Sequence, residues 1–163
     1  MGDIAEAAKI SRPTLYQAFP SKEAVFQAVL AGVFTAELEE IRARVAKAST
    51  PSDKLSAALD VWCVRNYELT TATPGARDLY ESAFEHAREE ASGATQAFED
   101  IVSEVLAGIG RRRSPSAREL AQLISSAIVG LKSTAVSSKQ LRKQVANLVT
   151  VVLSVRATAA TPT

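Results

Sequence analysis

The side chains best suited to chemistry lie between residues 11 and 22, near the start of the chain. Ser11 is followed by an Arg-Pro-Thr run, and a serine before a proline in the first turn is typical of a helix N-terminus. The backbone N–H groups of a helix N-terminus bind phosphate, and short polar or basic side chains beside them reach base edges in the major groove of DNA. Arg12 suits guanine or a phosphate, and Thr14 suits a thymine methyl group or a phosphate.

Two short helices must position these side chains. One is expected over residues 3–9 and the second over residues 12–19, because Pro20 disfavours helical backbone in the residue before it. Two short helices joined by a tight turn are typical of a helix-turn-helix, whose second helix enters the major groove. The candidate DNA contacts are therefore Ser11, Arg12, Thr14, Tyr16, Gln17 and Lys22.

The same stretch resembles the TetR family of bacterial transcriptional repressors. The resemblance covers roughly residues 3–30 and depends most on Leu-Tyr-x-x-Phe-x-Ser-Lys-Glu at residues 15–23. It implies a ligand-responsive repressor that binds operator DNA as a homodimer. It further implies a C-terminal domain that binds a small effector and two last helices that pair with a second subunit. On this resemblance Tyr16 contacts the DNA backbone and Lys22 contacts a phosphate.

Two features depart from the family pattern. Members have a further helix before the one expected at Asp3, so we expect the DNA-binding region to be truncated. Lys9 stands where the family often has a turn glycine, and a lysine at positive φ costs about 1 kcal/mol. Residues 1–30 also balance their basic and acidic groups, which is a weak electrostatic footprint for DNA. The alternative is a helical ligand-sensing or protein-binding dimer that has lost DNA binding.

The sequence offers no pattern typical of an enzyme or a metal site. It contains one cysteine, Cys63, and one histidine, His86. Neither stands in a metal-ligand spacing, and no nucleophile elbow or phosphate-binding glycine loop occurs. We therefore expect no catalytic residue, no metal and no cofactor.

Apolar residues repeat with helical periodicity along nearly the whole chain, which predicts an all-α fold. A helix-turn-helix with a connecting helix is expected over residues 1–48, an effector-binding and dimerisation domain over 49–157, and a disordered tail over 158–163. Beyond the first two helices we expect helices over 21–47, 53–71, 76–91, 94–110, 120–131 and 141–152, with breaks at residues 49–52, Thr73-Pro74-Gly75, Ser92-Gly93 and Ser137-Ser138.

An aromatic-rich group lies in the central helices. Cavities lined by such groups among helices bind small molecules, and plain core packing is the alternative. Cys63 is expected to be a buried apolar residue rather than a redox sensor. The candidate contacts for a small apolar or amphipathic effector are Trp62, Cys63, Tyr67, Tyr80, Phe84 and Phe98.

The last two helices have the clearest apolar stripes, and these offer more apolar surface than one thin domain can easily cover. Ala127 and Gly130 would permit close approach of a second copy, so we favour a symmetric homodimer over intramolecular core alone. The candidate interface residues are Leu120, Leu123, Ile124, Ala127, Ile128, Leu131, Leu141, Val145, Leu148, Val149 and Val152.

The composition excludes several other classes. The chain has 163 residues, of which 47% are hydrophobic and 23% charged, as in a globular protein. No apolar run reaches the ~18 residues of a membrane span, and no signal peptide is evident, so a cytoplasmic location is expected. The net charge is +1, but residues 105–163 carry nine basic groups and one acidic group. We interpret that excess as solvated helical faces.

Overall fold

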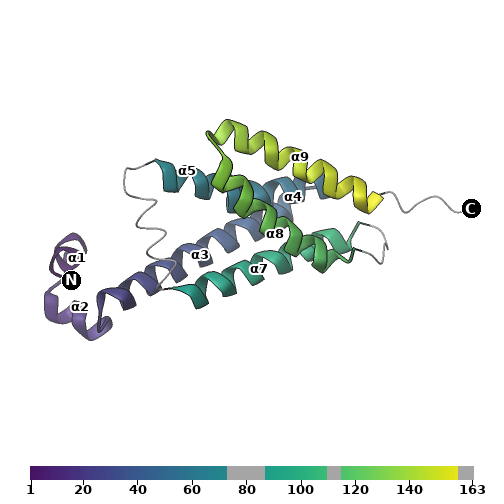
Figure 1. Ribbon diagram of the computed structural model, residues 1–163. Helices are drawn as coiled ribbons and strands as arrows, with labels where there is room; N and C mark the ends of the chain where they lie inside the picture. The colour runs from purple at the N-terminus through teal and green to yellow at the C-terminus, as the bar shows by residue number, and fades with distance from the viewer. Residues whose placement is uncertain (73–86, 110–114, 158–163) are drawn as a thin grey trace, which may run out of the picture.

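The computed structural model describes residues 1–72, 87–109 and 115–157, and these are helical with no strand. This confirms the all-α class. The elements in chain order are α1 (Gly2–Ala7), α2 (Arg12–Ala18), α3 (Lys22–Lys47), α4 (Pro51–Leu59), the π-helix η1 (Asp60–Arg65), α5 (Asn66–Thr71), α7 (Arg88–Ala107), α8 (Ala117–Thr134) and α9 (Ser138–Ala157) (Figure 1).

Most of the predicted helix ends are present. Ser11 Oγ accepts from the Thr14 backbone N–H and Ser21 Oγ accepts from that of Ala24, each at 3.2 Å, as N-caps do. The breaks at residues 49–52 and Ser137-Ser138 also occur, although α4 begins already at Pro51. The predicted break at residues 73–75, most of the predicted helix over 76–91, His86 and the tail at 158–163 lie outside the described residues.

The break predicted at Ser92-Gly93 is wrong, because α7 runs through both residues. A glycine inside a helix costs about 1 kcal/mol relative to alanine. That cost is outweighed by burial, since Ala91, Ala94 and Phe98 continue one apolar face across the site. A Cβ placed on Gly93 would meet nothing within 4 Å, so packing does not require glycine there.

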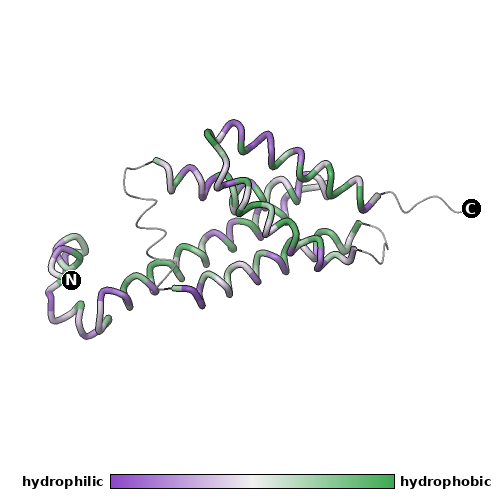
Figure 2. The backbone as a smooth tube through the Cα atoms, viewed as in Figure 1, coloured by the Kyte–Doolittle hydropathy of each residue, from purple (hydrophilic) through white to green (hydrophobic). Residues whose placement is uncertain are grey.

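The helices from α3 onward form a bundle around one apolar core (Figures 1 and 2). Helices α3, α4, α7, α8 and α9 each supply large apolar side chains that are almost completely buried. The core includes Ile41, Leu55, Leu59, Phe98, Leu106, Ile124, Ile128 and Leu141. None of the described helices is both long and apolar enough to cross a membrane.

Helix α3 links this bundle to the first two helices. It has 26 residues, or about 39 Å at 1.5 Å per residue. Figure 1 shows α1 and α2 at one end of α3, apart from the bundle, while α7 lies alongside the rest of α3. Within the bundle α3 packs against α4 and α7 through buried residues that include Phe34, Leu38 and Ile41. A single helix therefore runs from the predicted DNA contacts into the core.

Candidate functional site

The turn between α1 and α2 fixes the angle of the helix-turn-helix. Lys9 has a φ of 55°, the left-handed conformation that its position predicted. Its N–H donates to the Glu6 carbonyl, and the Ile10 N–H donates to the Ala5 carbonyl, both at 3.0 Å. These bonds satisfy carbonyl groups at the end of α1 and reverse the chain. Ala5 and Leu15 are buried between the two helices.

The predicted DNA contacts all lie on the exposed surface of α2 or at the start of α3. The Ser11 and Thr14 hydroxyl groups are 2.7 Å apart and hydrogen-bond each other at the N-terminus of α2. Tyr16 is 54% exposed although it is a large aromatic residue. The Lys22 ammonium lies 6.0 Å from the centre of the Phe26 ring. The structure thus brings Ser11, Arg12, Thr14, Tyr16, Gln17 and Lys22 to one end of the molecule.

The Arg12 side chain lies against the beginning of α1. A Cβ on Gly2 would fall 2.8 Å from Arg12 Nη2 and 3.2 Å from Cζ. Gly2 therefore leaves room for a guanidinium that crosses from α2 to α1. The sequence indicated the donor chemistry of Arg12 but not this contact.

A second candidate site is a cavity of about 110 Å³ inside the bundle. It lies among α3, η1, α5, α7 and α8, and Val129, at 67%, is the most exposed of its lining residues. The π-helix that borders it is a feature often found at functional sites. The lining residues are Phe34, Glu37, Trp62, Asn66, Ala91, Thr95, Ser125, Ile128, Val129 and Lys132.

The aromatic residues predicted to bind an effector are only partly brought together. Trp62 lines the cavity, and its ring stacks on that of Phe98 at 4.8 Å with an interplanar angle of 7°. Phe98 is fully buried behind it. Tyr67 lies elsewhere, and its hydroxyl donates to the Ala135 carbonyl at 3.1 Å. Tyr80 and Phe84 are outside the described residues.

Cys63 is completely buried and is not among the residues that line the cavity. Burial raises the pKa of its thiol to about 11, although the nearby Lys132 acts to lower it. The thiol is therefore protonated at neutral pH, as a small buried apolar residue would be.

The polar residues of the cavity were missed by the sequence analysis. Glu37 is only 7% exposed, and neither carboxylate oxygen has a hydrogen-bond partner within the described part of the chain. Burial raises the pKa of Glu37, while the Asn66 amide, Lys132 and Arg65 act to lower it. Asn66 thus lies close enough to Glu37 to stabilise its charged form.

Lys132 is the second charged group of the cavity. Its ammonium donates to Asn66 Oδ1 at 3.2 Å. Burial lowers the pKa of Lys132, and electrostatic interactions with Cys63 and Glu37 act to raise it. One signal could have revealed Glu37, because it lies three residues after Phe34 and one before Leu38 on the apolar face of α3. A charged residue on such a face is seldom buried without a reason.

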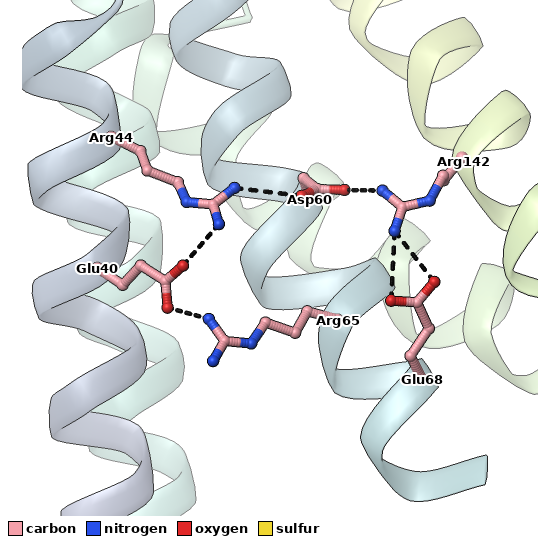
Figure 3. Close-up of polar contacts among 6 residues, drawn as sticks. All are labelled: Glu40, Arg44, Asp60, Arg65, Glu68 and Arg142. Atoms are coloured by element: carbon pink, nitrogen blue, oxygen red, sulfur yellow. Dashed lines mark hydrogen bonds and ion pairs between the residues drawn. The ribbon is translucent and has the colours of Figure 1, made fainter. Parts of the chain in front are cut away.

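A chain of ion pairs holds the outer side of the bundle together (Figure 3). Glu40 binds Arg44 and Arg65, and Arg44 lies 3.4 Å from Asp60. Arg142 on α9 binds both Asp60 and Glu68. Slight burial acts to raise the pKa of Glu40. The hydrogen bonds from Arg44 and Arg65 outweigh it, so the pKa is lowered. Exposed pairs each contribute less than about 1 kcal/mol, but together they connect α3, η1, α5 and α9.

The candidate dimer residues divide into two groups. The chain's own core buries Leu120, Ile124, Ile128, Leu141, Val145, Val149 and Val152, so in this fold they are intramolecular core rather than free surface. Ala127, Leu131 and Leu148 are partly buried, and only Leu123, at 61%, is strongly exposed. The stripes were correct helical faces, but most of their area packs within one chain. The apolar residues left exposed on α8 and α9 are Leu123, Val129 and Val151.

A comparison with protein families covers the first of the two sites. Residues 1–29 match the model of the family described as bacterial regulatory proteins, tetR family. The matched segment contains α1, α2 and the start of α3. No curated protein matches the chain.

Proposed function

Because residues 1–29 match the model of the bacterial regulatory proteins of the tetR family, we propose that the chain is a DNA-binding transcriptional regulator of this family and a ligand-responsive repressor. It binds operator DNA as a homodimer through α2 and releases it when a small molecule enters the cavity in the bundle. As a DNA-binding regulator it acts in the cytoplasm. Residues 1–48 are the DNA-binding and connecting part, and residues 49–157 are the effector-binding and dimerisation part.

The observation that carries this proposal is the course of α3. The helix begins at Lys22, beside the candidate recognition helix, and reaches the cavity with Phe34 and Glu37. Lys22 and Glu37 are about 22 Å apart along the helix axis at 1.5 Å per residue. A ligand that shifts α3 at the cavity must move its other end, because the helix is unbroken. A ligand with different affinities for the two positions of α3 therefore changes the affinity for DNA.

The exposed donors of α2 support DNA as the partner. Arg12 can contact guanine or a phosphate, Tyr16 and Lys22 can contact phosphates, and Gln17 can reach a base edge. The N-terminus of α2 adds backbone N–H groups that favour an anion. In a dimer, two such helices would enter successive major grooves roughly 34–36 Å apart.

The dimer is supported by the apolar residues that the core leaves exposed on the last two helices. Leu123 and Val129 lie on α8, and Val151 lies on α9. The space beside Gly130 is open, since a Cβ added there would meet nothing within 4 Å. Small and apolar residues on neighbouring helices suit a self-complementary interface.

Fluorescence anisotropy on labelled DNA from the gene's own upstream region tests the proposal. We expect specific binding that weakens steeply as salt rises, because phosphate contacts release counterions. Arg12→Ala and Tyr16→Ala should each weaken specific binding about tenfold or more. Arg42→Ala removes an exposed arginine from the bundle end of α3 and should leave binding unchanged. Equal binding by all four proteins, or no preference for this DNA over scrambled DNA, would contradict DNA recognition by α2.

A second candidate function is a ligand-sensing or protein-binding dimer without DNA activity. It is favoured by the balanced charge of residues 1–30, where Lys9, Arg12 and Lys22 are offset by Asp3, Glu6 and Glu23. Failure of the chain to bind any fragment of the upstream region at low salt, with the dimer intact, would favour this alternative.

A further inference from the structure

The cavity contains a buried carboxylate whose hydrogen-bonding capacity is not met. Both oxygens of the Glu37 carboxylate are buried and lack a hydrogen-bond partner among the residues that the structure describes. A buried carboxylate in this state is strongly unfavourable unless it is protonated or a donor reaches it. Because Glu37 lines a cavity that is only partly enclosed, a donor can reach it from outside the protein.

The remaining walls define the shape of the occupant. The rings of Phe34 and Trp62 lie 6.3 Å apart at 39° and form an apolar wall on the same cavity as Glu37. The volume of about 110 Å³ is below the ~150 Å³ of an engineered cavity that holds benzene, so only a compact group or part of a ring fits inside. Because the cavity is only partly enclosed, a longer ligand can extend out of it towards solvent.

The neighbouring cation does not satisfy the carboxylate. The Lys132 ammonium donates to Asn66 Oδ1, and no hydrogen bond from it reaches Glu37. The planar Glu37 carboxylate therefore has two oxygens that can each accept a hydrogen bond from a ligand. A planar amidinium or guanidinium binds both oxygens with two parallel N–H donors, which is the geometry that pairs most strongly with a carboxylate.

From this arrangement we infer that the cavity binds a small aromatic or apolar molecule that carries an amidinium or guanidinium group, and that Glu37 is the residue that selects it. The cationic group binds both Glu37 oxygens, and the apolar body contacts Phe34 and Trp62. The inference rests on the proposed function, since it names the ligand class of the same cavity. Ligand recognition would explain why a charged residue, Glu37, stands on the apolar face of α3.

Trp62 allows the inference to be tested without DNA. It is the only tryptophan of the chain, and it lines the cavity, so its fluorescence reports on occupancy. We would titrate the full chain with benzamidine, which has a flat apolar ring and an amidinium. Benzoate, which has the same shape but only acceptors, is the matched probe. Benzamidine should change the fluorescence with a Kd on the order of 1 mM or tighter, as its small size allows, and benzoate should not.

The variants locate the interaction. Glu37→Gln keeps the shape but removes one acceptor and the charge, so it should weaken benzamidine binding at least tenfold. Glu39→Gln makes the same change on the exposed side of α3 and should have no effect. Lys132→Met removes the neighbouring positive charge and should strengthen binding. A gain of affinity cannot result from misfolding, so this variant keeps the test decisive if Glu37→Gln is poorly folded.

Three results would overturn the inference. They are no benzamidine binding up to about 10 mM, equal binding by Glu37→Gln and the unaltered protein, or tighter binding of benzoate, which would make Lys132 the recognising group. The DNA response is a separate measurement. If benzamidine binds through Glu37 but leaves the affinity for DNA unchanged, the inference stands and ligand-dependent release of DNA is wrong. If DNA binding fails while the benzamidine results hold, only the proposed function is affected.

Discussion

The two ends of α3 are stabilised in different ways. In the helix-turn-helix, α1 and α2 bury only Ala5 and Leu15, and their geometry depends on local hydrogen bonds at Ser11, Lys9 and Ser21. In the bundle, Phe98, Leu106, Ile124 and many others form one continuous core. Helix α3 therefore joins a marginally stable helix-turn-helix to a well-packed bundle. A change at one end should therefore have local effects, and a change at the other should affect the whole fold.

The largest effect is expected at Phe98. It is fully buried and stacks on Trp62, so Phe98→Ala removes a large apolar group and leaves a cavity. We expect a loss of about 4 kcal/mol in the free energy of unfolding. Thermal unfolding should show a Tm lower by roughly 10 °C. Val136→Ala, at a position 84% exposed, is the control and should change stability by less than about 0.5 kcal/mol.

Leu15→Ala should have a large effect that stays local. Leu15 is 3% exposed and is the main buried side chain of α2. Its truncation should destabilise the helix-turn-helix by about 2–3 kcal/mol. Amide hydrogen exchange should accelerate in α1 and α2 and not in α7 or α8, while the thermal unfolding of the bundle stays within a few degrees. Tyr16→Ala, at an exposed neighbouring position, should leave exchange unchanged. Uniform acceleration over the whole chain would show that the two ends unfold together.

Glu37→Gln should have a moderate effect that depends on pH. The pKa of Glu37 is raised above its ordinary value of 4.5 in the fold, by burial and by Glu40 against the opposing effects of Asn66, Lys132 and Arg65. Between 4.5 and that raised value the folded chain binds more protons than the unfolded chain, so stability falls as pH rises. The variant lacks this titration, and we expect it to be more stable than the unaltered protein by about 1–2 kcal/mol at neutral pH.

Denaturant unfolding of both proteins from pH 4 to pH 8 measures this difference. It should be small near pH 4 and grow with pH until Glu37 is fully ionised. Glu39→Gln should show no such growth, because that carboxylate is exposed. A difference between the Glu37→Gln variant and the unaltered protein that is constant with pH would mean that Glu37 is not the titrating group.

The sequence predicted the helical elements well because their signals are local. Ser11 and Ser21 are caps where the serines precede helical runs, and Lys9 takes the left-handed turn that its position implied. The predicted break at Ser92-Gly93 is wrong because a glycine is only a local signal. The buried apolar face of α7 continues on both sides of it and keeps the segment helical. Tertiary packing overrode a local cost of about 1 kcal/mol.

The cavity was harder to predict because it is built from separate helices. Trp62 was found by residue type, but Glu37, Asn66 and Lys132 come from α3, α5 and α8 and meet only in the fold. The apolar stripes of α8 and α9 were correct as faces, yet periodicity does not say whether a face packs within the chain or on a second copy. Burial of Leu120, Ile124 and Val149 in the chain's own core decides that for those positions.

The smallest expected effect is at Lys9, and its sign is opposite to those at Phe98 and Leu15. A lysine at a φ of 55° is strained because its Cβ approaches the backbone, and glycine has no Cβ. Lys9→Gly should therefore stabilise the helix-turn-helix by up to about 1 kcal/mol and slow hydrogen exchange in α1 and α2. Ala8→Gly is the matched control, since Ala8 has a φ of −79° in the right-handed helical region and glycine there only adds freedom to the unfolded chain. It should accelerate exchange by a similar factor. Lys9→Ala keeps the strain but removes the charge, so slower exchange in that variant too would assign the effect to electrostatics. Slower exchange in Lys9→Gly alone would show that the turn between α1 and α2 is strained by the Lys9 side chain and that glycine relieves this strain.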